Sequence, residues 1–169
     1  RLQRYLDQEL WEQVKLCIEH LPQETEREKE HYYRYRWLFS LLYLCGLRVS
    51  ELSQNSMGSI FSRRDRHGTL RWWIDILGKG QKNRTVPVTE ELMNELVAYR
   101  TFKGLPPYPA ANEEYPLVLP IGYKKTKPLT RAAIHNIVKR IFTETAAYLR
   151  CLGPEYESDA LHVEQASTH

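Results

Sequence analysis

The chain has 169 residues, of which 42% are apolar and 27% are charged. This length and composition are typical of a globular domain that buries a core, and they exclude an intrinsically disordered chain. No apolar run approaches the roughly 18 residues that a membrane-spanning helix needs. Because no internal repeat or low-complexity tract appears, we expect one domain over residues 1–169 and no membrane association.

The three cysteines lie far apart at positions 17, 45 and 151, and no Cys-x-x-Cys pair occurs. This spacing predicts neither a zinc knuckle nor a disulfide framework, and a reducing cytoplasm is the expected location. No carboxylates and histidines cluster with the spacing of metal ligands. We therefore expect no metal ion and no small-molecule cofactor.

The net charge of +3 is modest, but the charges are unevenly distributed. Residues 63–84 and residues 124–150 each contain seven lysines and arginines, whereas residues 7–30 contain eight acids and four more follow Arg150. Basic charge gathered in two blocks is the pattern expected for a polyanionic partner. For either block alone, a solvated helix face is the alternative.

Helical spacing of apolar residues predicts two helices at the start of the chain. The first is expected over residues 7–20 and the second over residues 31–45. Gly46 is well placed to end the second helix, because glycine adopts the left-handed conformation at low cost. Ser50 is a candidate N-cap for a third, short helix.

The middle of the chain changes to the alternating pattern of a half-buried strand. Residues 70–76 alternate between apolar and polar, and residues 66–68 predict a turn from an earlier strand over 59–62. The glycine-rich segment 78–83 predicts a hairpin loop, and residues 84–88 predict the returning strand. A three-stranded antiparallel sheet results.

Helices return after the sheet. Thr89 predicts the N-cap of a helix that ends near Arg100, and a proline-rich surface loop follows around residues 106–109. Residues 117–119 predict a brief extended segment, and Thr130 caps the last long helix. The expected fold class is α+β, mainly helical, with one small antiparallel sheet.

Three segments contain residues suited to phosphate chemistry. Arg48, next to a glycine at a helix end, can extend its planar guanidinium into a cleft, and Glu51 can orient it if the segment is helical. An ordinary surface Arg–Glu pair is the alternative. Lys79 lies between two glycines at a hairpin tip, from which it can reach a leaving oxygen. A nucleotide-binding P-loop would lead into a helix, whereas this loop joins two strands.

The third segment is Thr130–Arg131, which follows Lys127. A helix start with a hydroxyl, an arginine and free backbone N–H groups is a natural phosphate site. An ordinary capped helix with a solvated basic lead-in explains the same residues equally well.

These segments occur in an order that resembles the tyrosine recombinases of the phage integrase family. Gly-Leu-Arg-Val-Ser-Glu-Leu at 46–52 is similar to the first conserved box of that family. Gly-Lys-Gly-Gln-Lys-Asn-Arg-Thr-Val-Pro at 78–87 is similar to its β2–β3 hairpin, and residues 165–169 are similar to the approach to its second box. The resemblance implies cleavage of double-stranded DNA through a 3′-phosphotyrosine without metal.

The resemblance also implies roles for individual residues. Arg48 would stabilise charge on the phosphoryl oxygens, Lys79 would be the general acid, and His169 would assist proton transfer. Further DNA contacts are implied for Lys82, Arg84, Lys127, Thr130 and Arg131.

The resemblance implies that His169, the last residue of the sequence, is the first histidine of the second box. None of the eleven tyrosines follows a His-x-x-Arg box, so we expect the nucleophile to be absent and this chain alone to be inactive. The parent protein would work as a tetramer on DNA, in integration, excision or resolution. A non-catalytic DNA-binding or regulatory module with an integrase-like fold is the alternative, and a metal-dependent nuclease is disfavoured.

Overall fold

A computed structural model describes residues 7–78, 80, 82–122 and 127–166. The helices are α1 (Gln8–Glu19), α2 (Glu26–Leu44), α3 (Val49–Gln54), α4 (Glu90–Phe102), α5 (Arg131–Leu152) and α6 (Glu157–Ala166). The strands are β1 (Ile60–Arg64), β2 (Leu70–Leu77) and β3 (Asn83–Val88), with short 3-10 turns at Met57–Ser59 (η2) and Pro154–Tyr156 (η4). The predicted fold class, mainly helical with a small antiparallel sheet, is confirmed.

Side-chain caps define where three helices begin. α1, α4 and α5 each begin after a capping residue, which is Asp7, Thr89 or Thr130. In each case the side-chain oxygen of the cap accepts a hydrogen bond from the backbone N–H of the residue three positions later. The N-terminal ends predicted for these helices are therefore confirmed. Gly46, which follows the last turn of α2, has φ of 68°, as predicted for a residue that ends a helix in the left-handed region.

Two predicted helix starts are wrong. α2 begins at Glu26 and not near residue 31, because Thr25 and Glu28 form a capping box. The Glu28 N–H donates to the Thr25 hydroxyl, and the Thr25 N–H donates to Glu28 Oε1. This reciprocal pair satisfies two N–H groups of the first turn. The cap of α3 is Arg48 and not Ser50, which lies inside the helix.

α6 follows α5 after a break at Gly153 and was not predicted. Its buried residues are Ala160 and Val163, so its apolar periodicity is weak. Arg150 of α5 donates to both Glu157 and Glu164, which ties α6 back against α5. The acidic segment after Arg150 is therefore a helix that packs through Ala160 and Val163 and forms exposed ion pairs with Arg150.

The sheet has the order β1-β2-β3, and both pairs of neighbours are antiparallel. Ile60, Ile74 and Ile76 are buried and define the face that packs on the body of the molecule. Because side chains alternate along a strand, residues such as Phe61 and Trp73, which are register partners, lie on the outer face.

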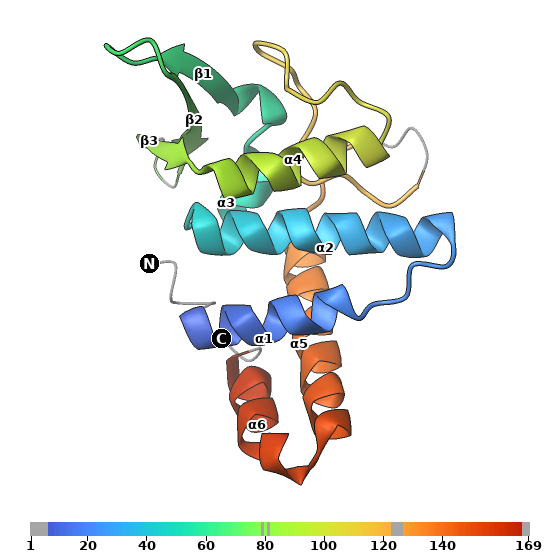
Figure 1. The fold of residues 1–169 in the computed structure, drawn as a ribbon. Coiled ribbons are helices and arrows are strands. Elements are labelled where there is room, and N and C mark those ends of the chain that lie inside the picture. Colours follow the sequence, from blue (N-terminus) through green and yellow to red (C-terminus); the bar gives the residue numbers. More distant parts are fainter. Residues whose placement is uncertain (1–6, 79, 81, 123–126, 167–169) are drawn as a thin grey trace.

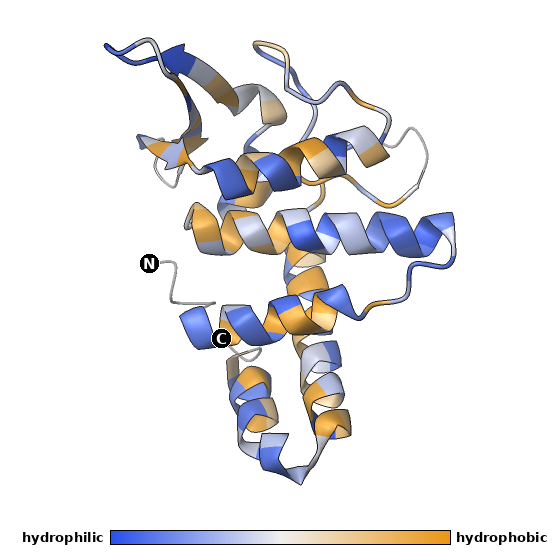
Figure 2. Ribbon diagram, viewed as in Figure 1, coloured by the Kyte–Doolittle hydropathy of each residue, from blue (hydrophilic) through white to orange (hydrophobic). Residues whose placement is uncertain are grey.

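Helix α2 lies at the centre of the helical layer. In Figure 1, α1, α2 and α4 lie side by side, and α5 runs crosswise to α1 and α2. Hydrophobic positions gather where these helices face one another (Figure 2). Trp37 of α2 has no exposed surface, and its indole N–H donates to the Leu117 carbonyl at 2.6 Å. Among the described helices, none is both long and apolar enough to cross a membrane.

The segment after α4 is anchored to the body more firmly than a free surface loop. Residues 117–119 are buried, and the neighbouring Pro116 forms an isolated antiparallel bridge with Ser56. The fully buried Arg100 donates to the Pro106 carbonyl at 2.7 Å and forms an ion pair with Glu113. The proline-rich loop is exposed as predicted, but Arg100 holds it at two points, at the Pro106 carbonyl and at the Glu113 carboxylate.

Candidate functional site

Arg48 lies at the junction between α2 and α3. Gly46 turns the chain out of α2, and Arg48 then occupies the N-cap of α3 with an exposed side chain. The Arg48 backbone N–H donates to Glu51 Oε1 at 2.8 Å. The main chain of Arg48 is therefore fixed while its guanidinium faces solvent, which is the arrangement required of a residue that binds an incoming anion.

Glu51 joins this junction to the sheet. Its side chain is only 5% exposed, and it forms a two-pronged ion pair with Arg84 of β3, with N–O distances of 2.5 and 3.0 Å. Arg84 also donates to the Gly46 carbonyl at 3.3 Å. Glu51 reaches Arg48 through the Arg48 backbone N–H, which is the contact by which it can orient Arg48.

The ionisation of Glu51 follows from these contacts. Burial alone raises the pKa of the Glu51 carboxyl, but the hydrogen bonds from Arg84 and from the Arg48 N–H, together with both positive charges, lower it below its ordinary value. Glu51 is thus an anion at neutral pH. The same pair raises the pKa of Arg84.

Asn55, at the C-terminal end of α3, holds the end of β2. Its side-chain amide accepts the Leu77 N–H at 2.9 Å and donates to the Leu77 carbonyl at 3.2 Å, as a neighbouring strand would. It also donates to the Glu51 carbonyl at 2.8 Å. Sequence reasoning missed this residue, because an asparagine after a short helix is an ordinary cap signal.

The β2–β3 turn therefore begins beside Glu51. An ideal Cβ placed on Gly78 would lie 3.2 Å from Glu51 Oε2 and 3.3 Å from the Lys82 carbonyl oxygen. The Gly78 N–H donates to that same carbonyl at 2.8 Å and closes the turn. A side chain at 78 would thus be tightly packed, which favours glycine at this position, directly before Lys79.

The structure brings together part of the predicted set. Arg48, Glu51 and Arg84 share one contact network, and Lys82 is exposed in the adjoining turn. Lys79 and His169 lie outside the described residues, so their predicted roles stay predictions.

The predicted phosphate site at the start of α5 is exposed. Arg131 occupies the first helical position and Lys127 lies four positions earlier in the sequence, and both side chains are exposed. The Thr130 hydroxyl accepts the Ala133 N–H at 3.0 Å, so its acceptor capacity serves the helix. α5 packs against α3, which carries Glu51.

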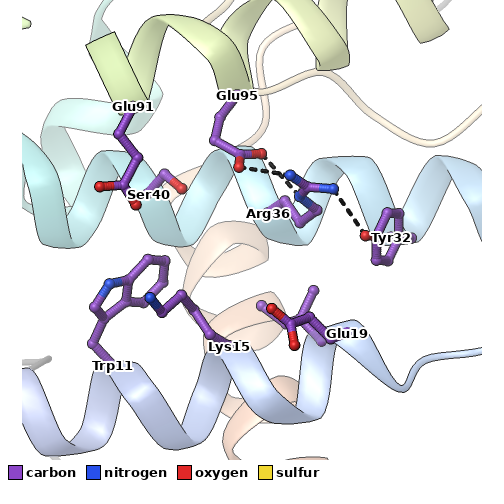
Figure 3. Close-up of a pocket in the computed structure, with 9 residues that line it drawn as sticks. Trp11, Lys15, Glu19, Tyr32, Arg36, Ser40, Glu91 and Glu95 are labelled. Atoms are coloured by element: carbon purple, nitrogen blue, oxygen red, sulfur yellow. Dashed lines mark hydrogen bonds and ion pairs between the residues drawn. The ribbon is translucent and has the colours of Figure 1, made fainter. Parts of the chain in front are cut away.

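A pocket of about 130 Å³ lies elsewhere, between α1, α2 and α4 (Figure 3). Arg36 crosses it to pair with Glu95 at 2.7 Å and also donates to the Tyr32 hydroxyl. Lys15 lies over the ring of Trp11, 5.3 Å from its centroid. The Arg36–Glu95 pair thus links α2 to α4, whereas the Lys15 contact lies within α1. The pocket lining includes none of the Arg48, Glu51 and Arg84 network.

Sequence comparison places these observations among known proteins. The phage integrase family matches residues 12–154, which is most of the chain and includes the network around Glu51.

Individual relatives are recombinases. Tyrosine recombinase XerD of Rickettsia conorii is 32% identical over 93 residues, which cover 55% of this chain and 29% of that protein. Tyrosine recombinase XerC of Staphylococcus epidermidis is 28% identical over 138 residues, which cover 82% of this chain and 43% of that protein. The chain thus spans less than half the length of these relatives. A solved structure of the XerH site-specific recombinase bound to difH substrate matches with a TM-score of 0.49 and 21% identity, covering 86% of this chain and 38% of that chain.

Proposed function

Because this chain belongs to the phage integrase family, we propose that it is the DNA-binding part of the catalytic domain of a site-specific tyrosine recombinase. The complete enzyme would break and rejoin double-stranded DNA through a 3′-phosphotyrosine.

The observation that carries this proposal is the network around Glu51. One buried carboxylate holds the Arg48 backbone on one side and Arg84 of β3 on the other. Gly78, which precedes Lys79 in the sequence, packs against the same carboxylate. A phosphate bound by Arg48 would thus lie close to the start of the turn in which the proposed general acid is found.

Each residue has a distinct task in the proposed reaction. Arg48 would bind the phosphoryl oxygens and stabilise the charge that develops on them in the transition state. Lys79 would give a proton to the leaving 5′-oxygen, and His169 would assist proton transfer. Glu51 touches no DNA in this scheme, and it acts by fixing Arg48 and Arg84.

DNA contact would extend from Arg48 to the exposed basic residues nearby. Lys82 in the β2–β3 turn and Lys127 and Arg131 at the start of α5 supply positive charge, and the first turn of α5 supplies backbone N–H groups. Contacts of this kind release counterions from DNA, so the affinity should fall steeply as salt rises.

The binding test uses this chain and a fluorescent duplex, with anisotropy measured across a salt series. Replacing Arg48 by Gln should weaken binding and reduce the slope of log K against log salt by about 0.9, the value expected for one lost phosphate contact. Arg27→Gln is the matched control, because Arg27 is exposed on the acidic first turn of α2. An affinity that does not change with salt would refute the DNA proposal.

The cleavage test uses a nicked suicide duplex, which traps a covalent protein–DNA adduct. We expect no adduct with this chain, and a phosphotyrosyl adduct would show that one of its own tyrosines is the nucleophile. In the longer protein, Arg48→Ala should lower cleavage by about 10²–10³-fold. Normal cleavage by that variant would remove Arg48 from the mechanism. DNA binding without any cleavage by the longer protein would favour a non-catalytic module.

A further inference from the structure

The turn between β1 and β2 concentrates positive charge at the end of the sheet remote from Glu51. Arg63, Arg64, Arg66 and Arg71 are all exposed there, and Asp65 is the single acid among residues 63–71. We call these four side chains the arginine turn. It extends away from the helices as a strongly hydrophilic tip (Figures 1 and 2).

The strand register places like charges directly opposite one another. Arg63 and Arg71 are cross-strand partners, which is a destabilising arrangement in an antiparallel pair. Asp65 relieves it only in part. Its carboxylate accepts the N–H groups of His67 and Thr69 and pairs with Arg71 at 3.1 Å. An unfavourable concentration of charge that the fold does not neutralise points to an anionic partner.

The composition of the turn selects the class of partner. Among residues 63–71, Leu70 is the single large apolar side chain, whereas protein–protein interfaces are usually built around a desolvated apolar centre. Arginine guanidinium groups match phosphate oxygens in a planar, two-pronged geometry. These features favour a phosphate backbone over an acidic protein surface.

The position of the turn defines which part of the DNA it would reach. β2 runs from the arginine turn to Leu77, which Asn55 holds beside the Glu51 network. Its eight residues span about 23 Å at roughly 3.3 Å per residue. A B-DNA helical turn is about 34 Å long. One duplex lying along the sheet can therefore meet both ends.

We propose that the arginine turn is a second phosphate-contact surface for duplex DNA, at the end of β2 opposite to the end that lies beside the Glu51 network. This inference rests on the proposed function, since Arg48 defines the first contact. It adds a DNA contact beyond the residues that the sequence motifs indicate, and this contact carries no sequence preference because it reads only the backbone.

The test compares two triple variants that lose the same charge. The first is Arg63→Gln, Arg64→Gln and Arg66→Gln, and the second is the control Lys15→Gln, Arg27→Gln and Lys29→Gln on α1 and α2. Binding to a 30-base-pair duplex is measured by anisotropy across a salt series. We expect the first variant to bind the duplex at least tenfold more weakly than the parent chain. The slope of its log K against log salt should be smaller in magnitude by about 2–3, because each lost phosphate contact removes about 0.9. The control should stay within about twofold of the parent chain.

The outcomes separate this inference from the proposed function. If the parent chain fails to bind the duplex, the proposed function fails. If the parent chain binds with a steep salt dependence and the first variant matches the control, the arginine turn is not a contact surface and the proposed function stands. Poly-glutamate is the second ligand. If the parent chain binds it as tightly as it binds DNA, and the first variant loses that binding, the inference is also overturned.

A thermal melt shows whether the first variant is as well folded as the parent chain. The first variant removes the like-charge pairing at Arg63 and also the Arg64 hydrogen bond to the Gly68 carbonyl. Because these two changes oppose each other, its Tm should stay close to that of the parent chain. If it falls instead, the single Arg66→Gln variant at the tip replaces it. That variant must then reduce the salt slope by about 0.9, and an unchanged slope would overturn the inference.

Discussion

Glu51→Gln is the substitution that most directly tests how the site is assembled. Glutamine keeps the size of the side chain and one oxygen for the Arg48 N–H, but it removes the charge that pairs with Arg84. We expect the sheet to be held less firmly on α3 without a large change in fold.

The expected loss of stability depends on the burial of Glu51 and on the partial exposure of Arg84. Hydrogen bonds to charged groups contribute about 1.5–3 kcal/mol, and breaking a fully buried ion pair costs about 3–5 kcal/mol. The Glu51 side chain is 5% exposed but that of Arg84 is 43% exposed, so solvent screens the pair. We therefore expect a loss of about 2 kcal/mol in the free energy of unfolding.

Urea unfolding followed by circular dichroism measures this loss. A double-mutant cycle with Arg84→Gln should give a coupling energy of about 1–2 kcal/mol, because the two side chains share two contacts. Arg36→Gln, which breaks the separate pair with Glu95, serves as a control that should be additive with Glu51→Gln. A coupling below about 0.3 kcal/mol between Glu51 and Arg84 would refute the reasoning.

The same pair has a defined pH dependence. The pKa of Glu51 is lower in the folded chain than its ordinary value of 4.5. Its contribution to stability is therefore fully present above pH 4.5 and is lost as the pH falls through the folded pKa. The stability difference between the parent chain and Glu51→Gln should shrink only in that acidic range. A difference that is constant from pH 7 to pH 3 would contradict an ionised Glu51.

Three further predictions concern residues outside this pair. Arg100→Met should lower the free energy of unfolding by about 3–5 kcal/mol in urea titrations, because it leaves the carboxylate of Glu113 without its buried partner; a loss below 1 kcal/mol would contradict this. Asn55→Ala should cost about 1–3 kcal/mol and speed hydrogen exchange at the end of β2, and unchanged exchange would show that the amide is dispensable there. Burial raises the pKa of Cys45 to about 12, so a thiol reagent at pH 8 should label the exposed Cys151 in the native chain and Cys45 only after unfolding.

Much of the fold could be predicted from the sequence because its signals are local. Side-chain caps at Asp7, Thr89 and Thr130 mark helix starts, and alternation over residues 70–76 marks the central strand. α6 could not be predicted in this way. It buries few residues, and its ion pairs with Arg150 are contacts between separate elements, which periodicity does not reveal.

In the candidate site too, contacts between neighbours in the sequence could be predicted, and contacts between distant residues could not. Arg48 and Glu51 lie in one short segment, so their association could be predicted from spacing alone. The pairing of Glu51 with Arg84 and the clamp of Asn55 on Leu77 join residues that are more than twenty positions apart. Such contacts depend on how the sheet docks on α3, which local propensity does not determine.

The packing of Gly78 on Glu51 has a consequence for how this chain can diverge. A side chain at 78 would press on the Glu51 carboxylate, which would have to shift by a few tenths of an ångström while it holds both Arg84 and the Arg48 backbone. Positions 51, 78 and 84 should therefore vary together among homologous chains, with glycine at 78 wherever an acid–arginine pair occupies the other two. A lineage that lost one of the three would be expected to replace the others, and its hairpin would need a new attachment to the body.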